Sequence, residues 1–149
     1  MSRGLQLTAH RPMLTLTRTV AFHALHRLYR PEWSPERNRE AFGALSEEPP
    51  HGHEYRCAVT VSAGPDAPRD LLVDLAQLDA ILQEEVVVPL GGRYLNRDVP
   101  AFARMLPTCE AIAALCYQRI AARLPAGVRL ERVRVSEDPT LHADCTGPA

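Results

Sequence analysis

The sequence predicts an α+β fold in which two helices cover one face of a four-stranded antiparallel sheet. Segments with alternating apolar and polar residues, the period of a half-buried strand, lie near both ends of the chain. Two segments with apolar residues at helical spacing lie between them. Strands and helices are grouped and do not alternate strictly, which favours an antiparallel sheet with its helices on one side.

The first half of the chain is expected to hold two long strands separated by a short helix. Residues 14–28 alternate threonines with apolar side chains and predict the first strand. Ser34 is a favourable N-cap and Pro35 suits the first helical position, so a short helix is expected over residues 35–42. The alternation of residues 53–63 predicts the second strand.

The second half is expected to hold two more strands and the two longer helices. Residues 71–74 predict a short third strand, and Asp74 caps the amphipathic helix that follows. A second amphipathic helix is expected over residues 108–124. Residues 128–135 alternate valine or leucine with charged residues and predict the fourth strand. A small sheet of this kind has exposed edges, so oligomerisation by edge pairing is expected.

The composition of the 149 residues is typical of one globular domain, residues 1–149. The net charge of −1 provides no attraction to nucleic acid or to an anionic membrane, so neither is expected as a partner. No apolar run reaches the roughly 20 residues of a membrane-spanning helix, and the first residues lack the pattern of a secretion signal. The 4 cysteines are scattered, which indicates reduced thiols and a cytoplasmic protein. All 17 basic residues are arginine, which excludes a lysine Schiff base and a Walker-type phosphate loop.

Three histidines have a spacing that suits a metal ion. His51 and His53 are two residues apart in a strand, so their side chains share one face of the sheet. His26, at the end of the first strand, can supply a third ligand for Zn²⁺, with a position left open for water or substrate. A solvated or hydrogen-bonded histidine pair is the alternative interpretation. His23 is expected on the other face of its strand.

Several segments resemble, in the same order, motifs of the 6-pyruvoyl tetrahydropterin synthase and 6-carboxytetrahydropterin synthase family. The resemblance covers about residues 14 to 145. The matching segments are residues 22–28 (FHALHRL, family FSAAHRL), 38–43 (the helix before FGKC), 51–53 (HGH), 72–75 (VVDF), 89–100 (PLDHxxLNxDVP), 107–110 (PTTE) and 133–137 (VRVxET).

This resemblance implies a T-fold, in which such sheets assemble into a hexameric barrel, so a homo-oligomer is expected. It implies zinc bound by the three histidines, and a small-molecule heterocyclic substrate in a pocket between subunits. Glu137 matches the glutamate that anchors the pterin ring through two parallel N–H bonds. Glu110 and Thr108 match a second element of this pocket. For Glu110, a favourable acidic residue in the first turn of a helix is the alternative.

The chain differs from the family at the positions of the family's proton-transfer residues. Leu45 stands at the position of the cysteine in FGKC, and Gly91 with Gly92 stands at the Asp-His pair of PLDH. Neither leucine nor glycine can transfer a proton. These changes argue against ordinary 6-pyruvoyl tetrahydropterin synthesis.

Glu48 is the predicted catalytic residue. It lies three residues before His51, as in a branch of the family with an ExxHGH motif that is linked to side-chain cleavage of dihydroneopterin in folate synthesis. A partly desolvated carboxylate near zinc could act as a general base. Glu47 and His142 are alternatives for the base, and a solvated acidic loop is the alternative for Glu48 itself.

Three functions are compatible with this pattern. The first is a zinc-dependent lyase or cyclase that acts on a pterin-like or other planar heterocycle, with chemistry diverted from the standard reaction into specialised-metabolite biosynthesis. The second is cleavage of a dihydroneopterin side chain for folate synthesis with Glu48 as base. The third is a catalytically inactive ligand-binding paralogue, which a closed zinc site would favour.

Overall fold

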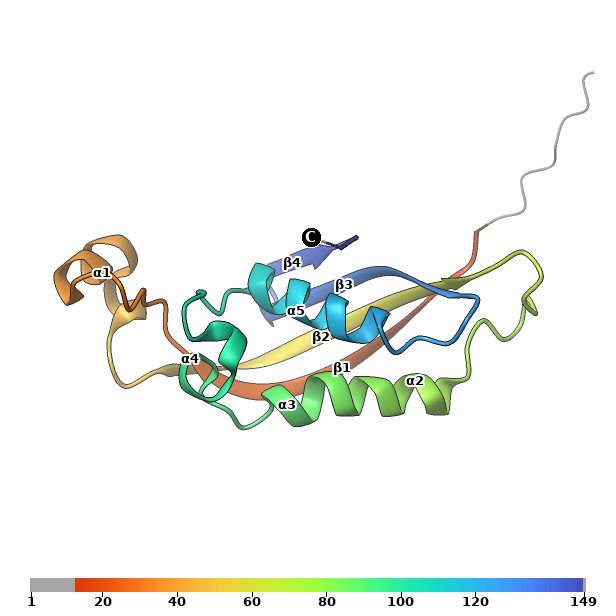
Figure 1. The fold of residues 1–149 in the computed structure, drawn as a ribbon, viewed down its shortest axis with the longest axis horizontal. Coiled ribbons are helices and arrows are strands. Elements are labelled where there is room, and N and C mark those ends of the chain that lie inside the picture. Colours follow the sequence, from red (N-terminus) through yellow and green to blue (C-terminus); the bar gives the residue numbers. More distant parts are fainter. Residues whose placement is uncertain (1–12, 149) are drawn as a thin grey trace, which may run out of the picture.

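The computed structural model describes residues 13–148 of the chain. These residues form one antiparallel sheet with the strand order β1-β2-β3-β4 (Figure 1). The strands are β1 (Thr15–His26), β2 (His51–Ala63), β3 (Val128–Asp138) and β4 (Leu141–Cys145). The helices are α1 (Pro35–Phe42), α2 (Leu75–Leu82), α3 (Val88–Leu90), α4 (Leu95–Asp98) and α5 (Cys109–Ala121), with tighter or wider helical turns at Gly43–Ser46, Gln83–Val87 and Pro100–Phe102. Within residues 13–148, none of these helices is long and apolar enough to span a membrane.

One face of the sheet forms the core with α2 and α5. Alternate residues of β2, such as Tyr55, Cys57 and Val59, are fully buried, as period-two alternation predicts. Leu78 of α2 and Ile112 of α5 are equally buried in the same cluster. The predicted fold class, a four-stranded antiparallel sheet with two main helices, is therefore confirmed.

Two details of the strand prediction were wrong. Residues 71–74 form no strand: they lead from the end of β2 to α2, and Val73 turns into the core instead of pairing. Both neighbours of β2 are already taken by β1 and β3, so this short segment finds no partner in the sheet. The fourth strand of the sheet is β4, which sequence reasoning missed. It pairs with β3 after a tight turn in which Asp138 accepts hydrogen bonds from the backbone and hydroxyl of Thr140, both at 2.6 Å.

Helix α1 lies at one end of the molecule, away from α2 and α5 (Figure 1). It begins as expected, with the Ser34 hydroxyl accepting a hydrogen bond from the backbone N–H of Arg37 at 3.1 Å. Buried Asn38 fastens the helix to the chain that enters it, since its amide bonds both the N–H and the C=O of Arg30. The following turn returns to the segment just after β1, where the Leu28 N–H donates to the Leu45 carbonyl at 2.8 Å. This contact places Leu45 close to the histidine end of the sheet.

Candidate metal centre and binding cavity

The register of β1 against β2 brings three histidines together. His26 is the cross-strand partner of His51, and His53 lies two residues further along the same face. One donor nitrogen of each ring lies within 4.8 Å of the others. The structure therefore clusters the three residues that the sequence spacing selected as zinc ligands.

Gly52 between the two β2 histidines is required by close packing on the opposite face of the sheet. A Cβ atom at Gly52 would lie 2.9 Å from His23 Nε2 and 2.9 Å from a methyl carbon of Leu25. His23 therefore faces away from the cluster, as expected from its spacing to His26. The glycine lets β1 approach β2 closely at the point where the metal ligands must converge.

His26 is held in the tautomer that a metal ion needs. Its Nδ1 lies 2.7 Å from the Pro107 carbonyl oxygen, and because a carbonyl only accepts, Nδ1 carries the proton. Burial lowers the pKa of His26 to about 4, with smaller contributions from His51 and His53, so the ring is neutral near pH 7. Its Nε2 lone pair is buried without a hydrogen-bond partner in the described part of the chain. The hydrogen bond from Nδ1 to the Pro107 carbonyl is the kind that orients a metal-ligating imidazole through its other ring nitrogen.

Glu137 brings a carboxylate to the same place from β3. Its Oε2 lies 3.7 Å from His53 Nε2 and 4.0 Å from His26 Nε2. The pairing of β3 with β4 is interrupted between Ser136 and Asp138, which leaves Glu137 as an extra residue at a β-bulge. A carboxylate that faces the lone pair of a neutral imidazole places two acceptors against each other, and a cation between them removes the repulsion. Three imidazoles beside a carboxylate are a donor set that suits Zn²⁺, so these residues fit the expected metal.

The cluster opens into a cavity of about 220 Å³ that gathers most of the predicted site residues. Thr108, Glu110 and Glu137 line it together with the three histidines. Thr108 also caps α5, because its hydroxyl accepts a hydrogen bond from the Ala111 N–H at 3.3 Å. The remaining lining residues include three leucines, Leu28, Leu45 and Leu141. The position of the family's cysteine is therefore inside the cavity, but it carries an apolar side chain.

Cys109 also lines the cavity, but its thiol cannot act as a base near neutral pH. Its pKa is raised to about 12, chiefly by burial, with smaller contributions from the nearby charges of Glu137 and Glu110. Tyr55, beneath the histidines, is fully buried, and its hydroxyl has no hydrogen-bond partner within residues 13–148. Burial raises the pKa of Tyr55, so this phenol stays neutral.

Glu48 lies outside the histidine cavity. Its Oε1 accepts a hydrogen bond from the Tyr94 hydroxyl at 3.0 Å and lies 3.4 Å from Arg27 Nε, in a separate surface hollow. Glu47 is exposed and lies 3.4 Å from Arg39. Within one chain, neither carboxylate is brought to the predicted metal ligands.

His142 is exposed and borders the cavity. Strand parity gives it the same face of β4 as Asp144, whereas Ala143 between them packs against the core. The ring of His142 is therefore not directed toward the histidine cluster by its strand.

Gly91 and Gly92 follow the edge of β1 and do not line the cavity. The Gly92 N–H donates to the His23 carbonyl at 2.7 Å. A Cβ atom at Gly91 would lie 2.6 Å from the backbone oxygen of Val87, and Gly92 has a φ of +70°. The loop is therefore built around glycine and has no room for an Asp-His pair in this conformation.

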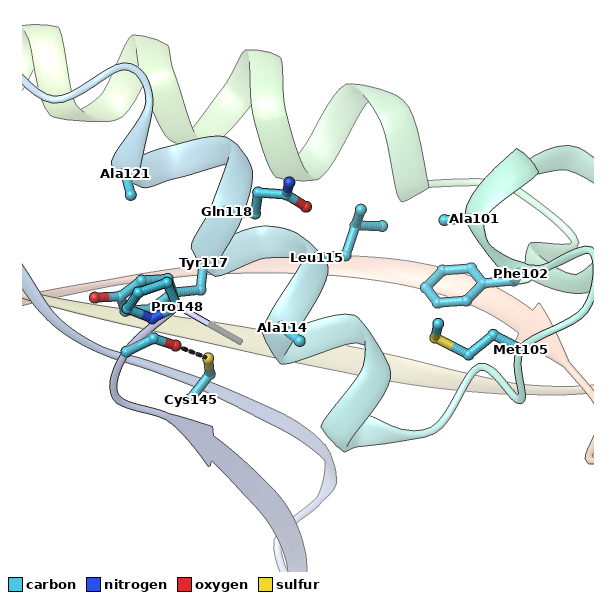
Figure 2. A pocket seen from close by; sticks show the side chains of 11 residues that line it. Ala101, Phe102, Met105, Ala114, Leu115, Tyr117, Gln118, Ala121, Cys145 and Pro148 are labelled. Carbon is cyan, nitrogen blue, oxygen red and sulfur yellow. Dashed lines mark hydrogen bonds between the residues drawn. The ribbon is translucent and has the colours of Figure 1, made fainter.

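A second and larger hollow, of about 430 Å³, lies between α5 and the end of the chain (Figure 2). Its walls are mostly apolar, with residues such as Phe102, Met105 and Leu115. Two of its polar groups are engaged locally: the Tyr117 hydroxyl donates to the Leu130 carbonyl, and the Cys145 thiol to that of Gly147. It has no cluster of metal ligands or carboxylates, so the histidine cavity is the candidate functional site.

Sequence reasoning missed three contributors to this site. The Pro107 carbonyl orients His26 across 81 positions of sequence, and no side-chain signal could have identified a backbone oxygen. Leu28 and Leu141 were also missed, since apolar residues at strand ends are usually assigned to the core.

Comparison with known proteins agrees with the resemblance of the motifs. The sequence model of the family described as 6-pyruvoyl tetrahydropterin synthase matches residues 15–148. The 6-pyruvoyl tetrahydrobiopterin synthase of Homo sapiens is 35% identical over 122 residues, which are 82% of this chain and 83% of the human protein. That of Poecilia reticulata is 34% identical over 122 residues, 82% of either chain. The solved structure of Caenorhabditis elegans 6-pyruvoyl tetrahydropterin synthase superposes with a TM-score of 0.82 at 28% identity, covering 91% of this chain and 96% of that one. Extensive matches in both sequence and fold show that this chain belongs to the 6-pyruvoyl tetrahydropterin synthase family.

Proposed function

We propose that the protein is a zinc-dependent lyase or cyclase that acts on a pterin-like or other planar nitrogen heterocycle. The observation that carries this proposal is the meeting of His26, His51 and His53 with Glu137 in one cavity. We also propose that its chemistry is diverted from standard 6-pyruvoyl tetrahydropterin synthesis, toward a specialised metabolite.

Different cavity residues would bind the ring of the substrate and its substituent. When bound, Zn²⁺ would act as a Lewis acid on an oxygen of the substrate. Glu137 can accept two parallel N–H bonds from the edge of the ring, and such charge-assisted pairs are the stronger kind of hydrogen bond. The Thr108 hydroxyl and the Glu110 carboxylate offer further polar contacts on the α5 side of the same cavity.

The proposed diversion from the standard reaction rests on the proton-transfer groups that the cavity lacks. Leu45 offers no proton-transfer group, and the Cys109 thiol stays protonated. The 220 Å³ formed by a single chain is below the roughly 300–1,000 Å³ of pockets that enclose a drug-sized ligand. It suits a ring system whose substituent extends out past the three leucines.

The first experiment is incubation of the zinc-loaded protein with dihydroneopterin triphosphate and with dihydroneopterin, followed by mass spectrometry of the products. We expect measurable binding without a 6-pyruvoyl product, because the family's cysteine and Asp-His pair are absent. Formation of that product would contradict the diversion.

Variants at Glu137 test the binding role directly. Glu137→Ala should abolish heterocycle binding while zinc remains at about one per subunit. Glu54→Ala is the matched control, since Glu54 lies in β2 next to His53 but on the opposite face. Unchanged heterocycle affinity in Glu137→Ala would show that the ring is anchored elsewhere.

Cleavage of a dihydroneopterin side chain for folate synthesis is the second candidate function, and the position of Glu48 three residues before His51 favours it. Glu48→Gln should then remove the 6-hydroxymethyl product and leave zinc in place. Because Glu48 lies outside the cavity of its own chain, this function requires either a loop movement or a neighbouring subunit. A variant that keeps its turnover would exclude Glu48 as the base.

We further propose a cytoplasmic homo-oligomer, with the hexamer as the expected size. In the described residues the sheet ends in β1 on one side and β4 on the other, and unpaired edges favour pairing between subunits. Analytical ultracentrifugation measures the size, and a monomer at micromolar concentration would contradict this proposal.

A further inference from the structure

We propose that the face of the sheet turned away from α2 and α5 binds an oligophosphate anion through Arg56, Arg132 and Arg134. These arginines lie along the middle of β2 and β3. His53 shares the opposite face with buried Tyr55, so the arginine site is separate from the histidine cavity. The proposal does not depend on the function proposed above.

Strand parity places the three arginines on this face. Val133 of β3 is fully buried in the core, so its two neighbours Arg132 and Arg134 point away from the helices. Arg56 does the same in β2, because the next residue, Cys57, is fully buried. Arg56 is exposed and the other two arginines are partly exposed, so an ion in solvent can reach all three.

The register of β2 against β3 brings the arginines close together. Arg134 is the cross-strand partner of Ala58, so Arg56 lies diagonally from it, with about 7–8 Å between their Cα atoms. Arg132 lies two residues from Arg134, about 6–7 Å away along β3. Like charges at this spacing repel each other, and an anion between them removes the repulsion. An oligophosphate carries its charged oxygens along a chain, which matches a row of guanidinium groups.

Two of these arginines have no partner for their charge. The side chains of Arg56 and Arg132 form no hydrogen bond or ion pair within residues 13–148. The Nε of Arg132 is also buried without an acceptor from that part of the chain. An antiparallel sheet can expose a polar face to water alone, but a buried donor without an acceptor is costly. Because the rest of Arg132 is partly exposed, rotation of its side chain can present this N–H to an anionic oxygen.

The carboxylates near this row do not neutralise the two unpaired arginines. Asp144 of β4 binds Arg134 through two hydrogen bonds of 2.7 and 2.9 Å, which hold the pKa of Asp144 below its ordinary value. Glu131 accepts a hydrogen bond from a serine hydroxyl at 2.6 Å. Glu54 lies beyond Arg56, at the end of the row away from Arg134, and forms no ion pair with the described residues. Arg134 has five N–H donors and keeps some of them for a ligand.

Calorimetric titration of the zinc-loaded protein with inorganic triphosphate tests the site. We expect Arg132→Gln and Arg56→Gln each to weaken binding by about 10-fold, because each loses charge-assisted hydrogen bonds to the anion. Arg39→Gln is the matched control: it removes the same charge from exposed α1, and its affinity should stay within about 2-fold of wild type. Equal losses in all three variants, or no binding by the wild-type protein, overturn the proposal.

Two further variants separate the arginine site from metal binding and from misfolding. Triphosphate can itself bind a metal ion, so the titration is repeated with His51→Ala, which is expected to lack zinc. Triphosphate binding that depends on Arg132 should persist in this background, and its loss would assign the anion to the histidine cluster and overturn the arginine site. Arg132→Lys keeps the charge without the planar fork, so it should bind about 3-fold more weakly than wild type. An unchanged affinity in Arg132→Lys and in Arg56→Gln also overturns the site, even if Arg132→Gln does not fold.

Discussion

Two regions of the site follow the family pattern to different extents. One is the strand ends that hold the histidines, and the other is the loops where the family has its proton-transfer groups. On the strands, His26, His51 and His53 match the family and converge within 4.8 Å. In the loops, Leu45 replaces a cysteine, while Gly91 replaces the aspartate of the Asp-His pair. A strand position depends on register and on packing against both neighbours, whereas a surface loop can change without disturbing the sheet. Under the proposed function, the strand ends would retain the metal site, and the changed loops would account for the diverted chemistry.

Removal of a strand ligand should have the largest effect. His51→Ala should lower zinc well below one per subunit and weaken its binding by more than about 100-fold, because two imidazoles hold the ion far less well than three. His23→Ala is the control, since His23 lies on the other face of the sheet. Zinc content measured by atomic emission should stay near one per subunit in that control. If His51→Ala keeps its zinc, the strand end is not the metal site.

Acidification should weaken the metal-free protein through His26. Its pKa is lowered from 6.5 to about 4 by burial, so the unfolded chain binds a proton between these pH values that the folded chain does not. The folded state should lose up to about 3 kcal/mol as the pH falls through this window, with no contribution from His26 above it.

Urea unfolding at pH 7, 5.5 and 4.5 in the presence of a chelator measures this loss. His26→Asn keeps an N–H for the Pro107 carbonyl but cannot titrate, so its stability should depend less on pH. Parallel pH profiles for the two proteins would mean that His26 is not buried in its neutral form.

The loop at the position of the family's Asp-His pair should be destabilised even by the smallest side chain. Gly91→Ala should destabilise the protein by about 1–3 kcal/mol, because the new Cβ would lie 2.6 Å from the Val87 backbone oxygen. Gly64→Ala is the matched control, since no atom lies within 4 Å of a Cβ there. Chemical denaturation of both variants gives the comparison. Equal stabilities would show that the loop adapts and that the lost pair can be restored.

Restoring the family's cysteine at position 45 should have the smallest effect. Leu45 is 47% exposed, so Leu45→Cys should change the free energy of unfolding by less than about 1 kcal/mol. The new thiol should also react readily with a thiol reagent, unlike the buried Cys57 and Cys116. A loss as large as that in Gly91→Ala would remove the distinction between the two changed positions.

Local patterns predicted most of the fold. The alternation in β1 and β2 and the caps of α1 and α5 depend on neighbouring residues, so these elements were correctly predicted. Residues 71–74 and β4 were not, because both are short and a short segment becomes a strand only where the sheet has a free edge.

The candidate site was predictable to a similar extent. His51 and His53 share a face by strand period alone, and the family resemblance pointed to Thr108, Glu110 and Glu137, all of which line the cavity. Glu48 was selected from its spacing to His51, but spacing along an irregular loop does not specify direction, and this side chain contacts Tyr94 instead.

By itself, then, the sequence determined the long strands, the main helices and the faces of the sheet that His26, His51 and His53 occupy, since these follow from backbone geometry over a few residues. Only the tertiary structure decided that His26 stands opposite His51, that the Pro107 carbonyl fixes its tautomer, and that Glu137 lies 3.7 Å from His53. These contacts join residues that are 25 to 84 positions apart, as the differences 51 − 26 and 137 − 53 show. Over such separations the register of the strands and the packing of α5 decide which atoms meet, and no local pattern encodes them.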